Sequence, residues 1–139
     1  FIITQMILQV ESSGHSESPG RFDQYMYPYL EKDLANGSIT KDFAQELLDC
    51  VFVKLNDLNK VRDQISAQAF AGFQVFQNIG AGGQTEDGMD ATNELSYMMM
   101  ETVVHLRLSA PSFSISVWQG TPDEFLYRAC ELARLGYLT

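Results

Sequence analysis

The chain has 139 residues, 45% of them hydrophobic, which suffices for one domain with a genuine core and is too little for two. Eighteen acidic residues against nine basic ones give a net charge of −9, and a field of that sign argues against nucleic acid or an anionic membrane as a partner. Two cysteines exclude a disulfide scaffold and a four-thiolate metal site, a reducing cytoplasm is expected, and no stretch predicts a membrane span.

Residues 1–10 have the apolar spacing of a helix with one broad buried stripe, formed by Ile2, Ile3, Met6, Ile7 and Val10. The segment has no initiator Met, and it lacks the basic start and the small-residue cleavage site of a signal peptide. We therefore expect this chain to be part of a longer protein.

A polar and irregular stretch, ESSGHSESPGRFDQY, occupies residues 11–25. Its glycines and proline break regular structure and its serines can hold turns, so a surface loop is the simplest interpretation. Several aromatic residues follow at once, however, and aromatics beside clustered hydrogen-bonding groups are what a pocket for a small polar substrate requires. Both interpretations stay open on composition alone.

Two helices are expected after this stretch. Pro28 suits the first turn of a helix and Gly37 suits a left-handed end, which predicts a short helix of about nine residues. Thr40 can then cap a helix of about six turns, the most secure element of the chain. Its apolar residues recur with helical period: Phe43, Ala44, Leu47, Leu48, Val51, Phe52, Leu55, Leu58 and Val61.

Beyond residue 70 the pattern changes to strand and helix in alternation. An apolar run at 75–79 predicts a strand, and a turn-rich acidic segment follows it. Asp90 or Thr92 is the expected cap of the next helix. The methionine cluster at 98–100 in that helix indicates core filling rather than a metal or cofactor site.

A second strand and a last helix complete the chain. Residues 112–118 alternate as a strand does, and Thr121 is the expected cap of a helix that Gly136 ends. This order predicts a parallel sheet whose functional loops lie at the carboxyl ends of the strands. The expected fold class is α/β, in a single partial domain that is mainly helical over 1–69 and parallel βαβα over 70–139.

Few residues indicate chemistry by themselves. His15 and Ser16 are a weak base and nucleophile pair because neighbours in a chain rarely align for catalysis, so hydrogen bonding to a substrate is the more economical role. One histidine in each region argues against a zinc site. Asp87 and Asp90 are not spaced as in the twelve-residue calcium loop, which favours a turn and capping role over calcium binding.

Four segments together resemble the glycyl radical enzymes, the family of pyruvate formate-lyase, choline trimethylamine-lyase and the glycerol and hydroxyproline dehydratases. They are GHSESPGRFDQYMYP, LNDLNKVRD, GGQTEDGMDATNELSY and TPDEFLYRACELARLGY, in collinear order over nearly the whole chain. The resemblance implies part of a ten-stranded α/β barrel that encloses a cysteine and a glycine loop. It also implies a glycyl radical, installed by a separate S-adenosylmethionine and iron-sulfur activating enzyme, and hydrogen abstraction from the substrate by a thiyl radical.

By the same resemblance, His15 and Ser16 hydrogen-bond polar groups of the substrate, and Phe22 forms part of the pocket wall. The implied reaction cleaves a C–O or C–N bond of a small polar substrate, as a dehydratase or lyase does. Many members have Asn where this chain has Ser13 and an aliphatic residue where it has Glu17, so the substrate stays open. A carboxylate at Glu17 either favours a cationic substrate or faces water.

The residues that carry the radical are expected outside these 139 positions. Cys50 and Cys130 lack the context of the radical cysteine and are expected to be inert core thiols, and Arg134 is one residue too close to Gly136 for the radical glycine loop. We therefore expect the chain to be inactive alone, and the full-length protein to be a cytoplasmic homodimer of an anaerobic bacterium, with a microcompartment as an option. Formate C-acetyltransferase chemistry and a non-catalytic piece that pairs with a barrel subunit are the competing hypotheses.

Overall fold

The computed structural model describes residues 3, 6, 7, 10, 18–57, 63–69 and 77–136. Within them, one parallel sheet has the strand order β1 (Gly20–Arg21), β2 (Asn78–Gly82), β3 (Ser112–Ser116). Ile79 of β2 pairs with Gly20 of β1 on one side and with Phe113 of β3 on the other. The predicted parallel sheet is confirmed, whereas the sequence gives no sign of β1, because only two residues form it.

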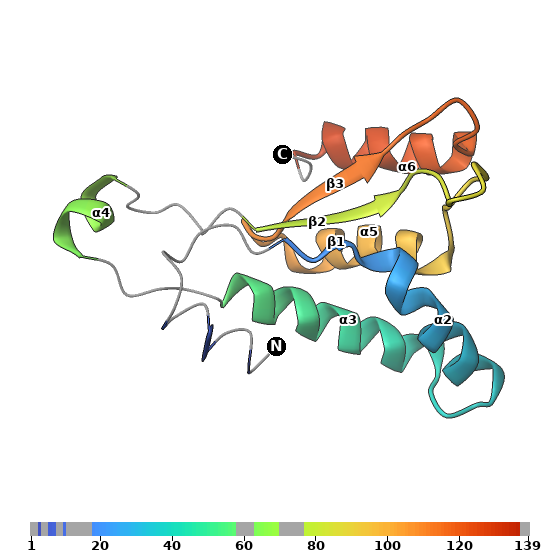
Figure 1. The fold of residues 1–139 in the computed structure, drawn as a ribbon, viewed down its shortest axis with the longest axis horizontal. Coiled ribbons are helices and arrows are strands. Elements are labelled where there is room, and N and C mark those ends of the chain that lie inside the picture. The colour runs from blue at the N-terminus through green and yellow to red at the C-terminus, as the bar shows by residue number, and fades with distance from the viewer. Residues whose placement is uncertain are drawn as a thin grey trace.

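Helix α5 is central among the described residues, because it contacts α2, α3, α6 and β2. Figure 1 shows α2 and α3 on one side of the molecule, α6 beside β3, and α4 apart from the rest. None of these helices is long and apolar enough to cross a membrane. Their bounds are α2 (Phe22–Ala35), α3 (Lys41–Asn56), α4 (Gln64–Ala69), α5 (Glu94–Leu106) and α6 (Asp123–Arg134).

Helix α2 is longer than its sequence predicts, because it begins at Phe22 and carries Pro28 in its interior. The first turn is fixed by the burial of Phe22 and Asp23, and Pro28 deprives a single carbonyl of its helical partner. The end at Gly37 is confirmed, with φ at 71°. Of the loop expected over 11–25, residues 11–17 lie outside the described residues, and the part from Gly20 onward is strand and helix instead.

Helix α3 confirms the cap at Thr40, whose hydroxyl oxygen accepts a hydrogen bond from the Phe43 amide at 3.2 Å. The helix ends at Asn56, before the predicted end at residue 61, and residues 58–62 lie outside the described part of the chain. One row of its apolar side chains is buried: Ala44, Leu48, Phe52 and Leu55. Tertiary packing thus buries only four of the apolar residues of α3 that recur with helical period.

Strand β2 ends later than predicted and helix α5 begins later than predicted, whereas residues 75 and 76 of the predicted strand lie outside the described residues. The strand continues through Ala81 and Gly82 because those residues pair with Ile115 and Ser116 of β3. The cap of α5 is Asn93, not Asp90 or Thr92. Its side chain accepts from the Ser96 amide, and the Ser96 hydroxyl oxygen accepts from the Asn93 amide, both at 3.1 Å. This reciprocal pair is a capping box with serine at its third helical position.

Helix α6 starts after Pro122, and Thr121 does not cap it. The Thr121 hydroxyl oxygen instead accepts a hydrogen bond from the Trp118 amide at 2.9 Å, which closes the turn between β3 and α6. The predicted end at Gly136 is confirmed, with φ at 78°.

The core lies between α5, the sheet and the neighbouring helices. Met98, Met99 and Met100 are buried in it, which confirms their role as core filling. Cys50 and Cys130 lie in helices as expected, yet both are exposed, so the expectation of core thiols is wrong. Cys50 is two residues from Leu48 and Phe52 of the buried row, and a step of two residues turns a side chain to the opposite face of a helix.

The four described residues of the segment 1–10 have helical backbone, and the others lie outside the described residues. The predicted burial is wrong for these four, since Ile3, Met6, Ile7 and Val10 are all more than half exposed. Apolar side chains with helical spacing are buried only where another element covers them, and nothing in the described part of this chain covers these.

Candidate functional site at the carboxyl edge of the sheet

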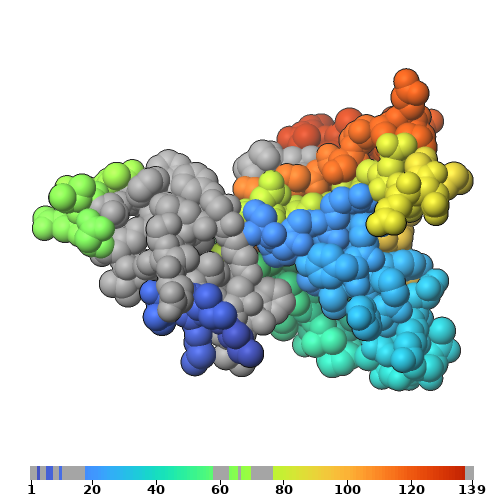
Figure 2. Space-filling model, in the orientation of Figure 1, coloured from blue at the N-terminus to red at the C-terminus, as the bar shows by residue number. Residues whose placement is uncertain are grey.

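The carboxyl ends of the three parallel strands meet at one edge of the sheet, where parallel α/β sheets bind their ligands. The start of α2 follows β1, residues 83–93 connect β2 to α5, and residues 117–122 connect β3 to α6. Figure 2 shows the β2–α5 connection, in yellow, lying against the start of α2, in blue. Polar side chains from all three junctions are hydrogen-bonded at this edge.

Asp23 is the central residue of this arrangement and is fully buried. Its Oδ2 accepts hydrogen bonds from the Gly82 amide at 2.8 Å and from the Ser96 hydroxyl at 2.5 Å. Its Oδ1 is buried and has no hydrogen-bond partner in the described part of the chain. One side chain therefore joins the start of α2 to the end of β2 and to the first turn of α5.

Three further hydrogen bonds connect the same junction to the β2–α5 connection. Arg21 Nη1 donates to the Gln84 carbonyl and Gln24 Nε2 donates to the Ala91 carbonyl, each at 2.8 Å. In the other direction, Asn93 Nδ2 donates to the Asp23 carbonyl at 3.2 Å. The residues on both sides of Phe22 are thus held by the neighbouring segment.

The third junction is joined through Trp118, whose indole Nε1 donates to Asp90 Oδ1 at 3.3 Å. Asp90 also accepts from the Thr92 amide at 3.3 Å and from the Thr92 hydroxyl at 3.1 Å, which confirms a turn role for this carboxylate. Asp87 lies in the turn that precedes it. No cluster of His, Cys, Asp and Glu side chains among the described residues could hold a metal ion.

Phe22, the one predicted site residue within the described part of the chain, is the first residue of α2 and is 6% exposed. Its ring meets Tyr25 edge to face, with the centroids 5.4 Å apart. It also lines an apolar groove of about 190 Å³ between α2 and α3, together with Met26, Leu30 and Leu48. His15 and Ser16 lie outside the described residues, so their roles stay predictions.

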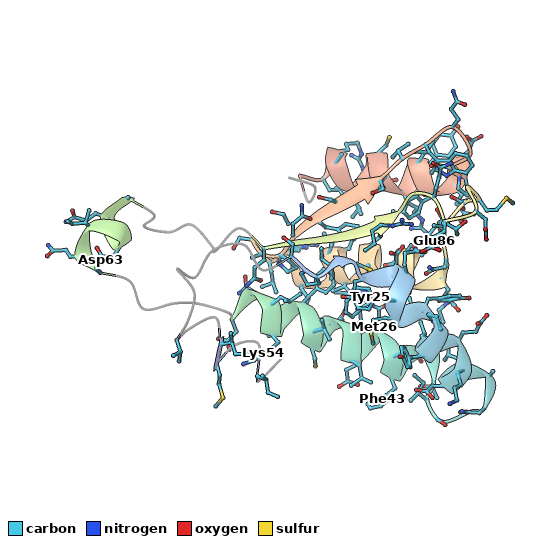
Figure 3. The ribbon with its side chains drawn as sticks, viewed as in Figure 1. Tyr25, Met26, Phe43, Lys54, Asp63 and Glu86 are labelled. Carbon is cyan, nitrogen blue, oxygen red and sulfur yellow. The ribbon has the colours of Figure 1, made fainter. Side chains whose placement is uncertain are left out.

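Figure 3 shows Tyr25 and Met26 on α2 and Phe43 near the start of α3. The Tyr25 hydroxyl donates to the Pro19 carbonyl at 3.0 Å, so the first turn of α2 reaches back across β1 to the polar stretch before it. A rigid start of α2 therefore fixes where that stretch joins the sheet.

Asp23, Asn93 and Ser96 are the residues that the sequence reasoning missed. Asn93 followed three positions later by Ser96 is a recognisable capping pair, and it could have located the start of α5. Nothing local marks Asp23 as buried, since its donors are 59 and 73 residues away in the chain.

Acidic groups shape the electrostatics near this edge. Burial raises the pKa of the Tyr97 hydroxyl, and the charges of Glu124 and Asp90 raise the pKa further. The pKa of Lys41 is raised because its ammonium group donates to Glu94 at 2.6 Å.

The whole chain, residues 1–139, matches the family model for pyruvate formate lyase-like proteins. A solved structure concerning 1,2-propanediol dehydration in Roseburia inulinivorans is 60% identical, with a TM-score of 0.88 over 98% of this chain and 17% of that one. The glycerol-bound B12-independent glycerol dehydratase of Clostridium butyricum is 57% identical, with a TM-score of 0.84 over 94% of this chain and 16% of that one.

The probable dehydratase YbiW of Escherichia coli K12 is 40% identical over 137 residues, which are 96% of this chain and 17% of that protein. The chain thus spans about one sixth of the length of these relatives. The matched family and the shared fold place this chain among the pyruvate formate lyase-like proteins, the glycyl radical enzymes.

Proposed function

We propose that this chain is the segment of a glycyl radical dehydratase that forms one wall of the binding site for a small diol or triol. The observation that carries the proposal is the high similarity, 60% and 57% identity, to the two structures that concern 1,2-propanediol and glycerol.

Within this wall, His15 and Ser16 hydrogen-bond the hydroxyl groups of the substrate and Phe22 supplies apolar surface. A buried site must match each donor and acceptor of a polyol, because an unmatched one costs roughly 1 to 3 kcal/mol. The position of Phe22 directly after β1, at the carboxyl edge of the sheet, supports its part, since parallel α/β sheets bind their ligands at this edge.

The radical chemistry itself belongs to residues outside this segment. A glycyl radical, installed by a separate S-adenosylmethionine and iron-sulfur activating enzyme, supplies the hydrogen abstraction that starts the reaction. The residues of this chain bind the substrate, orient its hydroxyl groups and exclude water. The segment alone is inactive, and the full-length protein acts as a cytoplasmic homodimer.

The test uses the full-length protein, activated under anaerobic conditions. Electron paramagnetic resonance should show a glycyl radical, and 1,2-propanediol or glycerol should be converted to an aldehyde and water. An activated protein without a radical signal would refute the family chemistry. A radical enzyme that converts pyruvate and coenzyme A, but no diol, would instead assign it to formate C-acetyltransferase chemistry.

A further inference from the structure

We propose that Asp23 is a positioning residue for substrate binding: its buried carboxylate fixes Phe22 and the chain just before it against β2 and α5. The inference rests on the proposed function, because it concerns the wall that Phe22 helps to form. Asp23 itself touches no substrate in this role and acts through its neighbours.

The two groups that Asp23 binds are each held in place independently. Gly82 has a φ of 76°, and a Cβ there would come within 2.9 Å of the Phe125 ring, so its backbone is confined by packing. Ser96 is fixed by the reciprocal bonds with Asn93 at the start of α5. Asp23 therefore ties α2 to two rigid points on different elements.

Hydrogen bonds of the residues next to Phe22 hold the same region in place. Arg21 and Gln24, on either side of it, donate to carbonyls of the β2–α5 connection, and Tyr25 donates to the Pro19 carbonyl. Strand β1 offers only two pairs of residues to hold this region. The side-chain bonds must therefore do most of the positioning, and among the side chains of Arg21, Asp23, Gln24 and Tyr25 only that of Asp23 is fully buried.

The charge on Asp23 also argues for a positioning role over a purely stabilising one. A buried carboxylate is costly to desolvate, and replacement by well-packed apolar groups is often neutral or favourable for stability. Here one oxygen, Oδ1, has no donor among the described residues. A group retained under these conditions fixes geometry, and a misplacement of about 1 Å at a reacting site can cost about 100-fold in rate.

The test compares three variants of the full-length, activated protein with the wild type, and expresses kcat per glycyl radical spin. Asp23→Ala should raise KM for 1,2-propanediol and lower kcat/KM by about 10- to 100-fold. Asp23→Asn should recover most of this loss, since its amide oxygen can take the place of Oδ2 and accept from both the Gly82 amide and the Ser96 hydroxyl. Asp42→Ala, an exposed carboxylate in the first turn of α3, is the matched control and should behave as wild type.

Three results would overturn the inference. A purely structural role would lower the radical yield of Asp23→Ala but leave KM and kcat per spin unchanged. Asn failing to rescue would show that the charge, not the tethering, matters. If Asp23→Ala does not fold, Ser96→Ala removes one of the two donors and should still raise KM by about threefold or more, and an unchanged KM there also overturns it. A wild type without diol dehydration refutes the proposed function instead, so the two failures are distinguishable.

Discussion

Ser16 gives the sharpest single-residue test of the substrate wall, because its change to alanine removes one hydroxyl and no charge. Loss of one hydrogen bond to a buried substrate costs roughly 1 to 3 kcal/mol, so KM for 1,2-propanediol should rise about 5- to 100-fold in the activated full-length protein. Ser18→Ala, two positions along the chain and exposed, is the matched control. Steady-state kinetics with equal KM for both variants would contradict the assignment of Ser16.

A substitution at Gly120 measures how tightly the β3–α6 connection, residues 117–122, is packed. Its backbone lies under the indole of Trp118, and a Cβ at this position would overlap the ring. Gly120→Ala should therefore displace Trp118, break its hydrogen bond to Asp90 and destabilise the full-length protein by about 1 to 3 kcal/mol.

Denaturant unfolding measures this loss of stability. Gln119→Ala, the exposed neighbour, should leave the unfolding free energy within about 0.5 kcal/mol of wild type. If the two variants are equally stable, the indole of Trp118 can move without cost, and its packing on Gly120 does not stabilise the β3–α6 connection.

At this scale, sequence predicts a residue's role only when the cause is local. The Thr40 cap and the left-handed ends at Gly37 and Gly136 follow from neighbours in the chain, and all three are confirmed. The burial of Asp23 depends on donors far away in sequence, and the exposure of Cys50 depends on which face of α3 meets α5. Neither can be read from local spacing.

At the scale of elements, the ion pair between Lys41 of α3 and Glu94 of α5 links two helices on the surface. Glu94 raises the pKa of Lys41 by accepting its hydrogen bond and by charge attraction. A lysine with a raised pKa stabilises the folded state fully below its unfolded pKa, and this stability is lost as pH rises through the folded pKa. The contribution is small because both side chains are more than a third exposed.

Lys41→Gln should therefore destabilise the full-length protein by about 0.2 to 1 kcal/mol at pH 7. The difference from wild type should stay constant well below the ordinary lysine pKa of about 10.4, and disappear as pH rises through the raised pKa of Lys41 in the folded protein. Denaturant unfolding across this pH range measures it, and about 1 M salt should reduce it at pH 7. A difference that grows with pH would show that another group is responsible.

Element boundaries show where local propensity loses to tertiary contacts. Pro28 looks like the start of α2, but burial of Phe22 and Asp23 moves that start six residues earlier. Glycines look like the end of β2, but pairing with β3 extends the strand through Gly82. Periodic helices such as α3 are predictable in place and type, since their signal repeats over several turns.

At the scale of the whole molecule, the 139-residue chain alone should not unfold cooperatively. Its outer strands β1 and β3 each have one unpaired side among the described residues, and large apolar side chains are exposed on α2 and α3, including Tyr29, Phe43 and Leu47. We expect a broad thermal transition and binding of a hydrophobic dye. The full-length protein is the comparison, and a sharp transition of the short chain without dye binding would contradict the expectation.

Family membership was predictable from sequence, whereas the barrel is not visible in this chain. Long collinear motifs identify a family because many residues must agree at once, and the matched family confirms that resemblance. The structure adds a mixed α/β unit with one parallel sheet. This unit matches about one sixth of the length of the related structure. The ten-stranded closure and the radical residues stay predictions, because they depend on contacts beyond these residues.

The antiparallel bridge between Gln84 and Asp90 closes residues 85–89 into a small hairpin tip. Within it, the Thr85 amide donates to the Met89 carbonyl at 2.9 Å, and Met89 is 67% exposed. Figure 3 labels Glu86, which belongs to this tip, near the end of β2. The hydrogen bonds that join the β2–α5 connection to Arg21, Asp23 and Gln24 come from Gln84, Ala91 and Asn93, outside the tip. The tip is therefore an attachment point: a spin label or a short peptide tag inserted here would lie beside the substrate wall and leave these three hydrogen bonds in place.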